Sequence, residues 1–212
     1  MDFEEWKPIY ELIVEEFGFS CQADEEAARV LNELLAKKDV YPLEMLRKML
    51  SGSVTVCGNA PRLDEDLSSA DLSGTVIAAD GATSALIHVA GRIPDVIVTD
   101  LDGDVSDQLV ANVRGAIVVI HAHGDNIEAL KRYVPLFSGK VMGTTQVRPF
   151  GLLHNFGGFT DGDRAVLMAR HFSATDIRLI GFNFEEPRPK EGREIGTKRK
   201  KLSWARRLIY DY

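Results

Sequence analysis

The chain has 212 residues, of which 45% are hydrophobic and 27% are charged, the composition of a globular protein with a sizeable core. Its two cysteines give no disulfide framework, its apolar runs are shorter than the roughly 20 residues of a membrane helix, and its acidic start is unlike a signal peptide, so we expect a cytoplasmic protein that does not enter a membrane. The net charge of −7 argues against general nucleic-acid binding, although residues 187–212 carry nine basic and three acidic side chains, which form either a solvated tail or an arm that grips phosphates.

Residues 1–51 are predicted to form three helices. Apolar residues recur at helical spacing from Trp6 to Phe17, Asp24 is a candidate cap for a second helix, and Pro42 opens a third. This N-terminal helical segment has few chemically reactive side chains. We expect it to pack on a main domain of residues 52–212, and its amphipathic helices offer a surface for a homodimer.

From Ser53 onward, short apolar runs alternate with amphipathic stretches. The expected strands are residues 53–57, 75–79, 96–99, 116–121, 140–143 and 177–181. The expected helices are residues 83–90, 104–114, 125–137, 161–171 and a basic C-terminal helix of residues 198–212. Nearly continuous apolar strands are typical of a parallel sheet buried on both faces. The alternation therefore predicts an α/β fold with a doubly wound, mostly parallel, Rossmann-like sheet and right-handed crossovers.

Polar, charged or glycine residues follow each expected strand, at the edge where such sheets bind ligands. The densest group is Asp100 and Asp102, which follow a buried strand and, at strand spacing, point the same way. Two close carboxylates repel each other unless a proton or a cation lies between them. Oxygen donors favour a hard cation such as Mg²⁺, so the sequence predicts a magnesium site here. Asp104 is the expected cap of the next helix.

Other strand ends add candidates for binding phosphates. Asp80 and Gly81 end the second strand, and the turn from Gly58 to Pro61 follows the first. Asp125 begins a helix, where it is either an acid favoured by the helix dipole or a third metal ligand. The chain has no P-loop and no GxGxxG, so metal ions, glycine turns and the basic end are left to hold phosphates.

The string His121-Ala122-His123-Gly124-Asp125 supports a different hypothesis, because HxHxD is a ligand spacing of zinc hydrolases. The histidine that commonly follows the aspartate in those enzymes is replaced by Asn126. A metal-dependent hydrolase and a nucleotide-binding module without catalysis therefore remain alternatives to a phosphate-transferring enzyme.

Several stretches, taken in order and spacing, resemble a known family. Residues 79–82, 94–102 and 124–130 resemble the acidic motifs of thiamin pyrophosphokinases, and more closely those of the related archaeal-type 6-hydroxymethyl-7,8-dihydropterin pyrophosphokinases. Residues 143–146, 158–165 and 180–184 are also similar to the latter family. Thiamin enzymes usually show Asp-Phe-Asp-Ser where this chain has Asp100-Leu101-Asp102-Gly103, and they add a C-terminal β-domain where this chain has its basic helix, which disfavours thiamin.

The resemblance implies a thiamin-pyrophosphokinase-like fold and an Mg²⁺-dependent transfer of diphosphate from ATP to 6-hydroxymethyl-7,8-dihydropterin, with AMP as the other product. It implies that Asp100, Asp102 and Asp125 are the catalytic metal ligands. The residues expected near the nucleotide are Gly58, Asn59, Asp80, Gly81, Thr99, His123, Lys198 and Lys201. The residues expected near the pterin are Thr144, Gln146, Asn155, Asp161 and Asp163. Thiamin or another small alcohol is the alternative acceptor.

Overall fold

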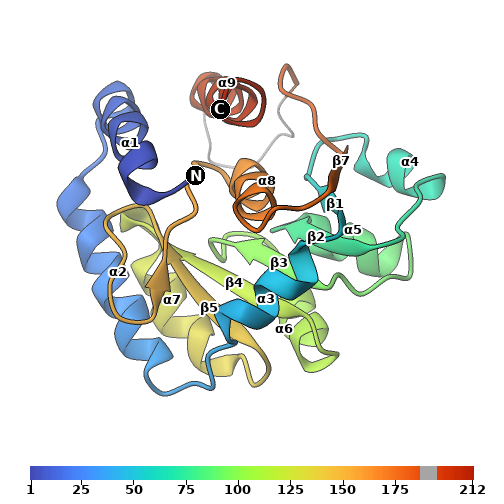
Figure 1. The fold of residues 1–212 in the computed structure, drawn as a ribbon, viewed down its shortest axis with the longest axis horizontal. Coiled ribbons are helices and arrows are strands. Elements are labelled where there is room, and N and C mark those ends of the chain that lie inside the picture. Colours follow the sequence, from blue (N-terminus) through green and yellow to red (C-terminus); the bar gives the residue numbers. More distant parts are fainter. Residues whose placement is uncertain (187–194) are drawn as a thin grey trace.

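The computed structural model describes residues 1–186 and 195–212, which form a seven-stranded sheet with helices on both faces (Figure 1). All neighbouring strands run parallel, in the order β6-β5-β4-β3-β2-β1-β7. The strands are β1 Ser53–Cys57, β2 Thr75–Ala79, β3 Val96–Thr99, β4 Ile117–Ala122, β5 Val141–Thr145, β6 Leu153–His154 and β7 Asp176–Ile180. This is the α/β parallel architecture that the sequence predicted.

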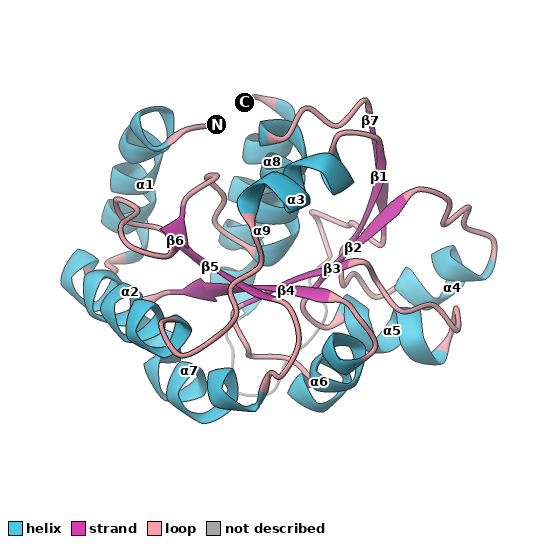
Figure 2. Ribbon diagram, turned by 60° about the horizontal axis from the view of Figure 1, so that its bottom comes forward, coloured by secondary structure: helices cyan, strands magenta, loops and turns pink. Residues whose placement is uncertain are grey.

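The helices pack in two layers (Figure 2). The helices are α1 Phe3–Phe17, α2 Cys21–Leu35, α3 Leu43–Leu50, α4 Leu63–Ser68, α5 Ala82–His88, α6 Val105–Val113, α7 Ile127–Tyr133, α8 Asp161–His171 and α9 Ile195–Tyr210, with 3₁₀ turns η1 Gly124–Asn126 and η2 Val134–Leu136. Helices α4 to α7 cover one face of the sheet, while α3, α8 and α9 lie on the other. Helix α2 packs beside α7 and against β4 and β5, so the N-terminal segment is joined to the sheet.

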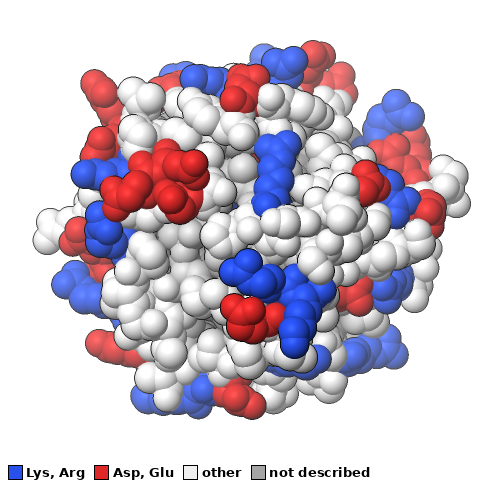
Figure 3. Space-filling view, viewed as in Figure 1, with Lys and Arg blue, Asp and Glu red and all other residues white. Residues whose placement is uncertain are grey.

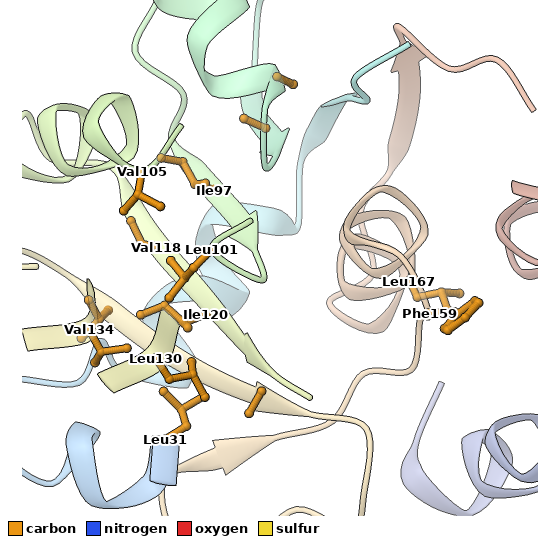
Figure 4. Packing of buried hydrophobic residues seen from close by; sticks show 14 of the residues in the cluster. Leu31, Ile97, Leu101, Val105, Val118, Ile120, Leu130, Val134, Phe159 and Leu167 are labelled. Atoms are coloured by element: carbon orange, nitrogen blue, oxygen red, sulfur yellow. The ribbon is translucent and has the colours of Figure 1, made fainter. Parts of the chain in front are cut away.

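The central strands β2 to β4 are mostly apolar because both faces of the sheet are buried there. Ile97, Val118 and Ile120 point into the core shared with α6 and α7, together with Leu31 from α2 (Figure 4). The alternate residues of the same strands point into a second core beneath α3 and α8. A strand with two buried faces leaves only its ends for polar side chains, which concentrates the chemistry at one edge.

Each expected strand and helix is present, and several have the predicted bounds. Strands β1, β2 and β3 and helix α8 have the expected bounds. Strand β5 ends two residues later than predicted. Thr144 and Thr145 are polar and resemble a loop in the sequence, but in the structure they pair with His121 and Ala122 of β4. Helix α4 and the two-residue strand β6 were not predicted, because segments this short show no periodicity.

One predicted cap is wrong. Asp24 does not begin the second helix, because Ser20 occupies the cap position and its Oγ accepts a hydrogen bond from the Ala23 N–H at 3.2 Å. Asp24 instead lies within the first turns of α2 and is 4% exposed. The expected cap at Asp104 is confirmed, since its carboxylate accepts from the Ser106 N–H at 3.0 Å.

The surface is mixed in charge. Figure 3 shows acidic and basic side chains interspersed over the face of the molecule that it draws. Helix α9 confirms the expected basic C-terminal helix, although it begins at Ile195 rather than at Lys198, and the basic residues of 187–194 lie outside the described residues. Cys21 and Cys57 are both free, as expected. Within residues 1–186 and 195–212, no helix has the length and hydropathy needed to cross a bilayer.

Candidate active site

The carboxyl ends of the strands open into one large pocket of about 1140 Å³. Its floor is formed by the loops that follow the strands, and its walls come from the corner between α1 and α2, the start of α8 and the first turns of α9. The predicted residues that line it are Gly58, Asn59, Asp80, Gly81, Asp100, Asp102, His123, Asp125, Gln146, Asp161, Lys198 and Lys201. Residues far apart in the sequence thus meet at one edge of the sheet, as the parallel topology predicts.

Three carboxylates that line this pocket lie close together. One oxygen from each of Asp80, Asp100 and Asp102 lies within 4.8 Å of the others. Strand spacing predicted that Asp100 and Asp102 point the same way, but neither residue lies within β3. The strand ends at Thr99, and Leu101 adopts a left-handed conformation with φ of 66°. The buried Leu101 side chain holds this turn, which brings both aspartates next to Asp80.

Asp80 is the most constrained member of the cluster. Its Oδ1 accepts hydrogen bonds from Thr99 Oγ1 at 2.8 Å and from Gln108 Nε2 at 2.9 Å. Burial, followed by the charges of Asp100 and Asp102, raises the pKa of Asp80 to about 7. A carboxylate held this close to two others is stabilised by a positive charge between them, which is the condition for a cation site.

Asp100 has the opposite electrostatic balance. Burial raises the pKa of Asp100, but the hydrogen bond and charge of His123 and the charge of Arg164 outweigh burial and hold its pKa well below the usual range. His123 Nε2 lies 3.2 Å from Asp100 Oδ2. This contact explains why the second histidine of the HxHxD string lies in the pocket, next to a carboxylate.

The turn that carries His123 is fixed by Asn126. Asn126 Nδ2 donates to the Asp100 carbonyl at 2.8 Å and to the His121 carbonyl at 2.7 Å, so it joins the ends of β3 and β4. Asp125 lies exposed on the same turn and lines the pocket. Within the described residues, the group of possible metal ligands contains Asp80 and not Asp125, so the role of Asp125 as a ligand stays a prediction.

The geometry does not favour the zinc hypothesis. His121 is 1% exposed, and its Nδ1 lies 3.0 Å from Thr144 Oγ1. Burial, followed by the charge of Arg164, lowers the pKa of His121 well below its usual value. Neither histidine of the HxHxD string belongs to a group of three possible ligands within the part of the chain that the structure describes.

Arg164 is a pocket residue that sequence reasoning missed. It is 3% exposed, and its Nη1 donates to Asp161 Oδ1 at 3.0 Å while Nη2 donates to the carbonyls of Gly158 and Phe159 at 3.3 Å. Burial and the charge of Asp100 raise the pKa of Asp161 well above its usual value. The arginine therefore supplies a buried positive charge beside an acidic site, in addition to the metal ions and the basic end that the sequence suggested.

Four predicted residues do not line the pocket, and their side chains have internal roles. Thr99 Oγ1 donates a hydrogen bond to Asp80 Oδ1. Thr144 bonds His121 and the Ile120 carbonyl, and Asn155 Nδ2 donates to the carbonyls of Gln146 and Val147. Asp163 is fully buried and accepts from the N–H groups of Phe159 and Thr160, which caps α8. The structure gives these four side chains internal contacts, and a contact of Thr99 with the nucleotide or of Thr144, Asn155 and Asp163 with substrate stays a prediction.

The wall of the pocket away from the sheet is aromatic and basic. Lys201 Nζ lies 5.6 Å from the ring centre of Phe19 and 5.4 Å from that of Phe159. An ammonium group over two aromatic faces is held by cation–π attraction. At least this part of the basic helix is therefore part of the pocket wall and not a solvated tail.

Comparison with known proteins adds a family and three close relatives. The family model described as 6-hydroxymethylpterin diphosphokinase MptE-like matches residues 28–188. Three proteins named 6-hydroxymethyl-7,8-dihydropterin pyrophosphokinase are similar over 99% of this chain. The protein of Pyrococcus furiosus is 45% identical, that of Methanothermobacter thermautotrophicus 44% and that of Methanocaldococcus jannaschii 38%, with 93%, 94% and 95% of their own lengths covered.

Proposed function

Because the chain belongs to the 6-hydroxymethylpterin diphosphokinase MptE-like family, we propose that it transfers a diphosphate from ATP to the hydroxyl group of 6-hydroxymethyl-7,8-dihydropterin. The chain is a pyrophosphokinase, and AMP and the pterin diphosphate are its proposed products. The observation that carries this proposal is the cluster of Asp80, Asp100 and Asp102 in a pocket large enough for both substrates.

We propose Mg²⁺ as the cofactor, and the donor set fits it. All three candidate ligands offer carboxylate oxygens, which hard cations prefer. The pKa of Asp80 is raised by burial and then by repulsion from Asp100 and Asp102, and a bound cation would relieve that repulsion. Mg²⁺, when bound here, would neutralise charge on the polyphosphate and help to orient it. Asp125, exposed on the neighbouring turn, remains a further proposed ligand.

The other pocket residues supply positioning and charge. Sheets of this type bind ligands where the strand order reverses, which in this chain is between β1 and β7. Gly58 and Asn59 follow β1 at that point, so we propose them, with Gly81, beside the nucleotide. Lys198 and Lys201 reach the pocket from α9, where their charge would stabilise phosphates.

The chemistry proposed for this chain is an in-line attack of the substrate hydroxyl on the β-phosphorus of ATP, with AMP as the leaving group. Such transfers depend mainly on positioning and electrostatics, which the fixed carboxylates and the buried Arg164 favour. Gln146 and Asp161 are the predicted pterin-binding residues that line the pocket.

A product assay tests the proposal. The protein is incubated with ATP, Mg²⁺ and 6-hydroxymethyl-7,8-dihydropterin, with thiamin in a parallel reaction, and AMP and the diphosphate ester are quantified by chromatography. We expect AMP and pterin diphosphate in equal amounts. AMP with thiamin alone would retain the chemistry and reassign the acceptor, whereas no AMP in either reaction would refute the proposed function.

A further inference from the structure

A buried acid outside the catalytic cluster connects the N-terminal helices to the pocket. Asp24 lies in α2 and is 4% exposed, and both of its carboxylate oxygens are hydrogen-bonded. Oδ1 accepts from the Gly124 N–H at 2.7 Å, and Oδ2 accepts from Tyr10 Oη at 2.6 Å and from Gln146 Nε2 at 3.4 Å. Asp24 and Gln146 both line the pocket. Because Ser20 already caps α2, this carboxylate is not used by its own helix.

The partner of Asp24 is the turn that carries His123. A Cβ on Gly124 would lie 2.6 Å from Ala23 Cβ, so only glycine lets the turn approach α2 this closely. The preceding residue, His123, places its Nε2 3.2 Å from Asp100 Oδ2. A continuous path of contacts therefore runs from α2 through the Gly124 amide to a carboxylate of the candidate cation site.

Helix docking alone does not require this carboxylate. The apolar side chains of Ala27, Leu31 and Leu35 are fully buried and already pack α2 on the sheet. A buried acid is costly unless its hydrogen bonds are satisfied, and here the shorter of the two bonds from pocket-lining residues comes from a backbone N–H of the active-site turn, at 2.7 Å against 3.4 Å from Gln146. The same turn is held from the sheet side by Asn126.

We propose that Asp24 is a positioning residue, which fixes the turn of residues 123–125 so that His123 and Asp125 are correctly placed around Asp100. The inference rests on the proposed function, since it assigns the N-terminal segment a part in the same reaction. Under this proposal the N-terminal helical segment, which has few reactive side chains, contributes to the geometry of the active site.

The test compares three variants in the full chain. Asp24→Ala leaves the Gly124 N–H unpaired, and we expect kcat to fall about tenfold or more, because small displacements of catalytic groups cost one to two orders of magnitude. Asp24→Asn keeps an oxygen that accepts from Gly124, and we expect it to recover most of the rate. Tyr10→Phe removes a different hydrogen bond to the same carboxylate and leaves those from Gly124 and Gln146, and Tyr10 lies outside the pocket, so kcat should stay within about twofold of the wild type.

Thermal unfolding of each variant separates positioning from stability. A purely structural role would lower the melting temperatures of Asp24→Ala and Tyr10→Phe alike and leave kcat of the folded protein unchanged, which would overturn the proposal. If the wild type makes no product, the proposed function fails by itself, and calorimetric titration with Mg²⁺–ATP then decides. Weaker binding by Asp24→Ala but not by Tyr10→Phe would support positioning, and equal binding by both would refute it.

Discussion

The most direct test of the carboxylate cluster is the Gly103→Ala variant, which adds a single methyl group beside it. A Cβ on Gly103 would lie against Asp80 Oδ2 and only 2.8 Å from Asp80 Cγ. Ordinary contacts begin at 3.4 Å, so the carboxylate or the turn must move by at least about 0.6 Å to relieve Cγ, and by more to relieve Oδ2. Asp80 cannot swing away freely, because Thr99 and Gln108 hold its Oδ1.

A displacement of this size has a calculable consequence. A shift near 1 Å at a catalytic group costs about 100-fold, so we expect kcat of Gly103→Ala to fall by roughly 10- to 100-fold. Overpacking should also lower the free energy of unfolding by about 1–3 kcal/mol. The assay is AMP formation at saturating substrates, with chemical denaturation run on the same protein.

Gly52→Ala is the matched control. Nothing lies within 4 Å of a Cβ at Gly52, and its φ does not require glycine, so the same chemical change should leave the rate unaltered. If Gly103→Ala retains the rate of the wild type while it is folded, the close approach of this turn to Asp80 has no catalytic importance and the reasoning is wrong.

Three further outcomes are expected. Asp100→Asn and Asp102→Asn should each lose turnover by orders of magnitude with a normal circular dichroism spectrum, and near-normal rates in either would remove it from the cation site. Burial, then the hydrogen bond and charge of Asp24, raise the pKa of Tyr10 above its usual value of about 10. The neutral phenol therefore stabilises the fold fully below pH 10. As the pH rises further this stability is lost, by at most about 1.4 kcal/mol per pH unit. Melting temperatures between pH 9 and 11 should therefore fall more steeply for the wild type than for Tyr10→Phe, and parallel slopes would contradict the assignment. Asp163→Ala should lower the free energy of unfolding by about 1–2 kcal/mol in urea titration, because the capping box of α8 keeps its N-cap Thr160 but loses the N3 carboxylate, and an unchanged midpoint would show that this half of the box is dispensable.

The sequence was sufficient for six of the seven strands and for the edge that bears the chemistry. Strands buried on both faces are mostly apolar, so the ends of β1, β2 and β3 could be placed before the glycine or aspartate that follows each of them. Parallel topology then places Asp80 and Asp100 at one edge, although they follow different strands. Local sequence and one topological rule together are enough for this part of the site.

The differences from prediction concern side chains whose partners are distant in sequence. Asp24 resembles a helix cap locally, but its donor at Gly124 is 100 residues away. Thr144 and Asn155 follow or flank strand ends, as ligand-binding residues do, yet they turn inward to satisfy neighbouring groups. Arg164 was not singled out because its burial depends on carbonyls that the preceding loop presents. Pattern alone does not distinguish a polar group facing a ligand from one facing the protein.

The place of β7 in the sheet has a consequence for biosynthesis. Strand β7 pairs with β1, and the Gly58 and Ala60 N–H groups donate to the carbonyls of Ile180 and Gly181 at 2.9 Å. Partners in this ladder, such as Ser53 and Asp176, are 123 residues apart. During translation, one edge of β1 therefore stays unpaired until β7 has left the ribosome. The turn proposed to hold the nucleotide is then among the last parts of the enzyme to fold.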